Sequence, residues 1–286
     1  MTLNIDAIAR LDLRPAVQEM TARDTIVYAL GLGYGEDPMD RCELPFVYEK
    51  GLHAMPSMAN ILCHPGFWAQ DPQYGIDWVK VLHAEQEFRI HSPLPAEGRI
   101  RGEVRVTGVE DKGEGKGALI HQVKELFAEE SGTHLASVRQ TLMLRGNGGQ
   151  GSFGQPEAQP EALPDASPDT TAEIATRPGL ALLYRLSGDR NPLHADPAVA
   201  AKAGFDRPIL HGLCTMGIAA RALIQHCCDY DPTRLAGMFV RFSRPVVPGD
   251  TLRFELFGNG ANLRFRARAV ERDVVVLDRC HATIRP

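Results

Sequence analysis

The sequence lacks the features that mark several classes of protein. Its six cysteines form no Cys-x-x-Cys pair, which argues against a disulfide framework and favours reduced thiols. No apolar run is long enough for a signal peptide or a membrane-spanning helix. Lysine and arginine form no cluster, and the formal net charge of −5 argues against nucleic acid or an anionic membrane as a partner. We therefore expect a cytoplasmic protein without membrane insertion.

The composition is that of a globular protein, with 44% hydrophobic and 23% charged residues. A chain of 286 residues predicts two domains. Residues 148–178 are rich in Gly, Pro, Gln, Ala and acidic residues and show neither helical nor strand periodicity, which indicates a linker. We therefore predict an N-terminal unit over residues 1–147 and a C-terminal unit over residues 179–286.

The two units resemble each other when they are aligned at an offset of 156 residues. IVYALGLG (26–33) matches LLYRLSGD (182–189), and HAMPSMANIL (53–62) matches HGLCTMGIAA (211–220). EFRIHSPLPAEGRIRGEVRV (87–106) matches VRFSRPVVPGDTLRFELF (240–257), since each combines a strand, a proline turn and a second strand. Three matches in the same order predict an internal duplication.

Each unit is predicted to be an α+β repeat. In the second half, apolar residues at helical spacing predict a long helix over Leu213–Cys227, and strands are expected at 236–243, 251–257, 262–270 and 274–284. The stretch GNGAN (258–262) indicates a hairpin between two of these strands. A long helix followed by an antiparallel meander predicts a sheet wrapped around the helix in each repeat.

The stretch YRLSGDRNPLHADP (184–197) brings an acid, Asp189, and an imidazole, His194, close together. Gly188 permits a sharp turn and Pro192 prevents a continuous helix, so the two side chains lie on a bent loop. Asp196 is predicted to cap a short helix that follows. The alternative is a purely structural loop, in which the aspartate caps backbone amides and the histidine bonds to backbone.

The stretch FDRPILHGLCTM (205–216) supplies the other half of a candidate site. Gly212 precedes the long helix, so its N–H lies among the unpaired donors of a helix N-terminus, where a carbonyl oxygen can approach closely. His211, beside it, is a candidate substrate-binding residue. A carboxylate, an imidazole, the Asn191 amide and a backbone donor suit the addition or removal of water beside a thioester carbonyl.

These two stretches together resemble the hydratase motif of the MaoC-like family, and specifically the type-2, R-specific enoyl-CoA hydratases. YALGLG, LPFVYEKG and KVLHAEQEFRIHSPLP in the first half resemble the N-terminal repeat of that family. The resemblance implies a double hot-dog fold, with each sheet around its own long helix, and a coenzyme A thioester substrate. It also implies that the N-terminal repeat shapes an acyl pocket and has no catalytic pair, so that each chain has one active site.

The resemblance assigns roles to particular residues. Catalysis falls to Asp189 and His194, with Asn191 as a polar helper and the Gly212 amide as oxyanion donor. Glu49, in VYEKG, matches a glutamate implicated in the activity of relatives, although a structural role explains it equally well. Arg241 and Arg244 are candidates to contact the phosphates of coenzyme A, and exposed strand-face arginines are the alternative.

The implied reaction is the reversible hydration of trans-2-enoyl-CoA to (3R)-hydroxyacyl-CoA. It needs no metal and no redox cofactor, because the substrate itself carries coenzyme A. The resemblance favours a homodimer, although two repeats in one chain also allow a monomer. Two other functions are compatible with the residues, namely a hot-dog acyl-CoA thioesterase and a non-catalytic acyl-CoA binding protein.

Overall fold

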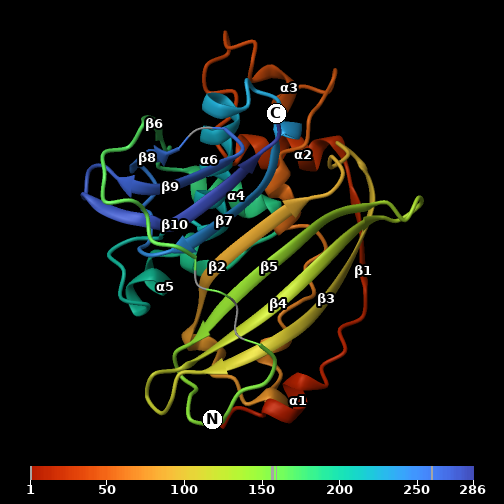
Figure 1. Ribbon diagram of the computed structural model, residues 1–286, viewed down its shortest axis with the longest axis vertical. Coiled ribbons are helices and arrows are strands. Elements are labelled where there is room, and N and C mark those ends of the chain that lie inside the picture. The colour runs from red at the N-terminus through yellow and green to blue at the C-terminus, as the bar shows by residue number, and fades with distance from the viewer. Residues whose placement is uncertain (1, 156–157, 159, 259) are drawn as a thin grey trace.

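Ten strands form one antiparallel sheet. The computed structural model describes residues 2–155, 158, 160–258 and 260–286. The strand order is β1-β3-β4-β5-β2-β7-β10-β9-β8-β6, and Figure 1 shows the strands of the two halves side by side along this sheet. The strands are β1 (Ala16–Met20), β2 (Val81–Ile90), β3 (Gly98–Asp111), β4 (Ala118–Ala128), β5 (His134–Leu144), β6 (Thr170–Ala175), β7 (Leu235–Phe242), β8 (Thr251–Phe257), β9 (Asn262–Ala269) and β10 (Val274–Ile284).

Six α-helices and seven short 3-10 helices occur among the described residues. The α-helices are α1 (Ile5–Ala9), α2 (Ala22–Leu30), α3 (Leu44–Val47), α4 (Leu180–Tyr184), α5 (Pro197–Lys202) and α6 (Gly212–Cys227). The 3-10 helices are η1 (Pro56–Asn60), η2 (Trp68–Gln70), η3 (Pro72–Tyr74), η4 (Trp78–Lys80), η5 (Arg185–Ser187), η6 (Pro192–His194) and η7 (Pro232–Arg234). None of the described helices combines the length and the apolar character that a membrane crossing requires.

The internal duplication predicted from the sequence is confirmed by the connectivity. Counted from its outer edge, each half places its first, third, fourth, fifth and second strand in that order, as β1-β3-β4-β5-β2 and β6-β8-β9-β10-β7. The second strands, β2 and β7, pair antiparallel and join the two halves, with Glu85 opposite Arg241. The double hot-dog class expected from the sequence therefore describes this chain.

Residues that the duplication relates meet each other where the halves join. At a twofold axis, a residue contacts its own symmetry equivalent, and in a duplicated chain that equivalent lies at a fixed offset in the sequence. Three such pairs are separated by 156 residues. The rings of Tyr28 and Tyr184 lie 5.9 Å apart, and the Asn60 amide lies 3.5 Å from the sulfur of Met216. Glu85 and Arg241 form an ion pair. The offset read from the sequence thus marks a pseudo-twofold axis in the fold.

The long helix expected in the first half is absent, which corrects the prediction for residues 53–62. Only the five-residue 3-10 helix η1 forms there, whereas its counterpart α6 spans sixteen residues. Cys63 adopts a left-handed backbone (φ 51°) and Pro65 disfavours helical geometry at the residue before it, so the helix cannot continue. Lys124 of β4 donates hydrogen bonds to the carbonyl oxygens of Asn60 and Leu62, and these bonds satisfy the end of η1.

A second correction concerns the predicted linker at residues 148–178. Its last part contains β6, which pairs with β8, and Ala172 and Ile174 of β6 belong to the core. These alternating apolar residues form a strand because the edge of β8 is available to them. Phe153 forms an isolated bridge with Val109 of β3. Residues 156, 157 and 159 of the predicted linker lie outside the described residues.

The elements predicted for the second half are confirmed. Helix α6 and strands β7 to β10 begin and end within one residue of the expected positions. β8 and β9 pair antiparallel, as the hairpin prediction required, although Asn259 at its tip lies outside the described residues. The main core includes buried residues of both halves, with Phe88 of β2, Phe254 of β8 and Met216 of α6 among them. A shared core means that each half helps to stabilise the other.

Candidate active site

The loop that carries Asp189 is shaped by its own short side chains. Helix α4 continues into η5, which is followed by Gly188, and the φ of 123° at this glycine turns the chain sharply. The Asp189 carboxylate then accepts the N–H of Asn191, and the Asn191 side chain accepts the N–H of Leu193. These two consecutive turns lead into η6, which ends at His194. The predicted bent loop is therefore present, and Asn191 caps it.

His194 is buried and has a defined tautomer. Only 8% of its surface is exposed. Its Nδ1 lies 2.8 Å from the carbonyl oxygen of Ile209, and because a carbonyl only accepts hydrogen bonds, Nδ1 carries the proton. Nε2 of the neutral ring is therefore an acceptor. Burial lowers the pKa of His194 below its ordinary value, although the bond to Ile209 and the charge of Asp189 oppose that shift.

His211 joins the site as a support for both catalytic candidates. Its ring stacks on that of His194, with centroids 3.8 Å apart, and its Nε2–H donates to the backbone carbonyl of Asp189 at 3.1 Å. Only 1% of the residue is exposed. Burial, reinforced by the adjacent His194, lowers the pKa of His211 to about 4. A neutral ring is thus held between Asp189 and His194.

The functional groups of Asp189, His194 and His211 converge. A carboxylate oxygen of Asp189 and one ring nitrogen of each histidine lie within 4.8 Å of one another. A water molecule that donates two hydrogen bonds of roughly 2.8 Å spans acceptors about 4.6 Å apart. Asp189 is exposed, so solvent reaches this point. The spacing therefore suits one water molecule held between a carboxylate and an imidazole.

Gly212 begins helix α6, directly after His211. A β-carbon on Gly212 would lie 3.2 Å from the ring of Phe242 in β7, a tight contact that would need the ring to move by a few tenths of an ångström, so glycine fits closely here. No side chain caps this end of the helix among the described residues. The first amides of α6 thus remain available to an acceptor, as the sequence predicted for Gly212.

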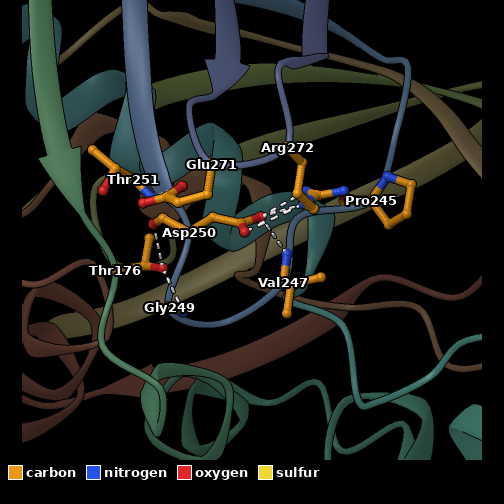
Figure 2. Close-up of polar contacts among 8 residues, drawn as sticks. All are labelled: Thr176, Pro245, Val247, Gly249, Asp250, Thr251, Glu271 and Arg272. Atoms are coloured by element: carbon orange, nitrogen blue, oxygen red, sulfur yellow. Dashed lines mark hydrogen bonds and ion pairs between the residues drawn. The ribbon is translucent and has the colours of Figure 1, made fainter.

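A polar network behind the site holds the segment that carries His211 and Gly212. Figure 2 shows the turn between β7 and β8, where the buried Asp250 carboxylate accepts the N–H of Val247 at 2.8 Å and Arg272 at 2.6 Å. The same turn offers the carbonyl of Val246 to the N–H of Leu210 at 2.7 Å. Because Leu210 directly precedes His211, the turn helps to position the start of α6.

Three predicted residues lie outside the cluster of Asp189, His194 and His211. Glu49 is exposed after α3, and its carboxylate makes no hydrogen bond or ion pair within the described part of the chain. Arg241 forms an ion pair with Glu85 at 2.6 Å, which ties β7 to β2. Arg244 is exposed next to Ser243. Their predicted roles in activity and in coenzyme A binding remain predictions.

A partly buried histidine and a buried ion pair were not predicted. The ring of His83 in β2 contacts that of Phe242, with centroids 4.8 Å apart and the rings tilted by 58°, so the N-terminal half reaches the residue that packs on Gly212. Burial lowers the pKa of His83 to about 4. Glu43 pairs with Arg221 of α6 at 2.6 Å, and both are buried. His83 lies within the quoted stretch KVLHAEQEFRIHSPLP, but neither its contact with Phe242 nor the pair of Glu43 with Arg221 could be read from a local pattern, because each joins distant segments.

Comparisons with known proteins agree with this architecture. Residues 159–279 match the model of a MaoC like domain, and residues 18–146 match the model of an MFE-2 hydratase 2 N-terminal domain. The chain is 38% identical over 278 residues to the peroxisomal enoyl-CoA hydratase 2 of Arabidopsis thaliana, covering 89% of this chain and 87% of that protein. It is 41% identical over 243 residues to 3-hydroxyacyl-thioester dehydratase Y of Mycobacterium tuberculosis, covering 83% and 82%.

A solved structure gives the same result in three dimensions. The MaoC-like dehydratase of Phytophthora capsici superimposes with a TM-score of 0.89 and 31% identity, and the match covers 99% of this chain and 98% of that one. The two family models together span most of both halves. These matches agree with the order of the strands and with the loop that carries Asp189 and His194. The chain therefore belongs to the MaoC-like dehydratase family.

Proposed function

We propose that this protein is an R-specific 2-enoyl-CoA hydratase, which reversibly adds water to trans-2-enoyl-CoA and forms (3R)-hydroxyacyl-CoA. The observation that carries the proposal is the convergence of Asp189, His194 and His211 within 4.8 Å at a solvent-accessible loop. The relatives named enoyl-CoA hydratase and 3-hydroxyacyl-thioester dehydratase support it, because hydration and dehydration are two directions of one reaction.

In the proposed mechanism, Asp189 and His194 orient one water molecule. Asp189 offers a carboxylate oxygen as an acceptor, and because the Nδ1–H of His194 is bonded to Ile209, Nε2 of that ring is free to accept as well. As the water oxygen bonds to the β carbon, its proton passes to one of these bases and the double-bond electrons move toward the thioester oxygen. The protonated base then delivers the proton to the α carbon, which completes the addition.

The start of α6 stabilises the charge that develops on the thioester oxygen. The Gly212 N–H points from a helix N-terminus, where the helix dipole favours negative charge. One oxyanion donor of this kind contributes roughly 10²–10³ in rate. General acid–base assistance adds about 10²–10⁴. His211 acts as a positioning residue, because it bonds the Asp189 carbonyl and stacks on His194.

The remaining features of the proposal come from the family resemblance. The product has R configuration, and the reaction uses no metal or redox cofactor beyond the coenzyme A of the substrate. The N-terminal half shapes the acyl pocket, and each chain has one active site. We propose that the enzyme works as a homodimer in the cytoplasm.

The test is an absorbance assay of enoyl-CoA hydration with Asp189→Asn and His194→Gln. Each change removes an acceptor for the water proton while it preserves the shape of the side chain, so we expect turnover to fall at least about 10²-fold. Asp206→Asn and His226→Gln are matched controls, because both residues are exposed. Chiral analysis of the product identifies the R configuration.

Three results would contradict the proposal. Near-normal turnover in either active-site variant would remove Asp189 or His194 from the mechanism. Release of free thiol from the acyl-CoA, without loss of the enoyl absorbance, would instead identify a thioesterase. Tight binding of acyl-CoA by the wild-type protein without turnover would identify a non-catalytic binding protein.

A further inference from the structure

A second cluster of ligand-type side chains lies on the sheet of the N-terminal half. His91 directly follows β2, Glu125 lies in β4, and His134 begins β5, so three adjacent strands contribute one residue each. One donor atom from each lies within 4.8 Å of the other two. The rings of His91 and His134 are 4.1 Å apart, and His134 Nε2 lies 2.9 Å from Glu125 Oε2. The proposed hydratase mechanism uses none of these residues.

Neighbouring residues hold the three side chains in place. The Ser137 hydroxyl donates to Glu125 Oε2 at 2.5 Å and lies 2.8 Å from His91 Nε2, so it connects two members of the cluster. The ring of Phe127 stacks on that of His134, with centroids 4.9 Å apart. Outer contacts of this kind orient metal ligands and tune their affinity.

The chemistry of the cluster suits a divalent transition metal. Two imidazoles and one carboxylate form a common ligand set for Zn²⁺, which binds nitrogen at about 2.0–2.1 Å. His91 is exposed and Glu125 and His134 are partly buried, so an ion can reach the cluster from solvent.

Positive charges near the cluster limit the affinity. Arg105 lies 3.9 Å from the other Glu125 oxygen, Oε1, so it leaves Oε2 for the metal. The positive charges of Arg89 and Arg285 also act on His91 and disfavour a cation there. Arg285 is tied to backbone carbonyls of Ile90 and Thr233 by hydrogen bonds. These charges favour moderate binding over the very tight binding of a closed structural site.

We propose that His91, Glu125 and His134 form a binding site for a divalent transition metal such as Zn²⁺, separate from the site of Asp189. The ion would replace the proton that His134 Nε2 shares with Glu125 and would link the end of β2 to β4 and β5. Since the three strands are hydrogen-bonded neighbours, only side-chain rotations are needed to bring the donors to bonding distance. The bound ion stabilises this end of the sheet.

The test is a Zn²⁺ titration of the metal-stripped full-length protein in competition with a chromophoric chelator. We expect micromolar affinity at this site and a weakening of at least about tenfold in His134→Ala and in Glu125→Gln. His226→Ala removes an exposed histidine outside the cluster and serves as the matched control. Zn²⁺ is expected to raise the Tm of the wild-type protein and of this control, but not that of His134→Ala.

A second variant separates this site from the candidate active site, whose Asp189, His194 and His211 also form a ligand-type group. His194→Gln is expected to keep the Zn²⁺ affinity that His134→Ala loses. Conversely, His134→Ala is expected to keep full hydratase turnover, which also shows that it folds. Equal Zn²⁺ binding by His134→Ala and wild type, or no binding at millimolar Zn²⁺, would overturn the proposal.

Discussion

At the scale of single residues, the site depends on which nitrogen each histidine leaves free. Ile209 fixes the proton of His194 on Nδ1, and the Asp189 carbonyl fixes that of His211 on Nε2. Both tautomers follow from one fact, namely that a backbone carbonyl accepts and never donates. These bonds alone would also suit a charged ring, and it is burial that lowers the pKa of both histidines and favours the neutral form.

The same burial predicts how stability depends on pH. Because the pKa values of His83 and His211 are lowered to about 4, the unfolded chain binds more protons than the folded one between about pH 6.5 and pH 4. Stability is therefore full above that window and is lost as the pH falls through it. Urea unfolding at pH 7.5, 6 and 5 measures this loss. His211→Phe, which keeps an aromatic ring, is expected to show a smaller loss than His226→Gln.

A stability that is equal at pH 7.5 and pH 5 in the wild-type protein would contradict this expectation. It would mean that the two rings become charged without cost, and therefore that they are not buried in the folded protein. His226 provides the baseline, because its side chain is already exposed to solvent in the folded protein.

At the scale of elements, helix α6 is anchored to the first half by a buried ion pair. Arg221 donates to Glu43 at 2.6 Å and to the carbonyl of Leu32 at 3.2 Å. The second oxygen of Glu43 accepts the N–H of Gly35 at 2.8 Å. The turn GLGYG (31–35) after α2 is therefore the place where α6 contacts the first half.

Removing one partner of this pair is expected to destabilise the protein more than removing both. Arg221→Met leaves the Glu43 charge buried, and a loss of about 3–5 kcal/mol in the free energy of unfolding is expected. Replacing Glu43 by Leu at the same time removes the unpaired charge, so the double variant is expected to recover much of the loss. Urea denaturation measures both effects. A double variant less stable than either single variant would contradict this account.

At the scale of the whole molecule, the two halves depend on each other. β2 and β7 form the central pair of the sheet, and one core includes residues of both halves. Alone, each half would expose an unpaired edge strand and apolar surface. Such surfaces lead to aggregation. The duplication therefore gives one ten-stranded unit and not two independent domains.

We expect residues 1–155 and 160–286 to be insoluble when each is produced alone and to form an active enzyme when they are produced together. The cut lies in the segment between the halves and keeps β6 with its partner β8. Solubility, and hydratase turnover of the co-expressed pair, measure the outcome. A soluble, cooperatively unfolding first half would show that the shared core is not required.

The sequence alone was sufficient to predict features that depend on residues close to one another in the chain. The apolar stripe of α6, the alternation in β7 to β10, the cap at Asp196 and the turns around Asp189 depend on residues a few positions apart, and all are present. The offset of 156 was also visible, because a duplication leaves its pattern in the chain. The family resemblance and the bent loop followed from these short stretches.

Tertiary structure decided what depends on distant segments. β6 formed inside a predicted linker because β8 presented an open edge, and the first half has no long helix because the chain turns at Cys63. The ion pair of Glu43 with Arg221 and the tilted ring contact of His83 with Phe242 join residues more than 150 positions apart. A local sequence pattern indicates the conformation of a segment. Only the tertiary packing determines which buried charged groups and aromatic rings contact each other.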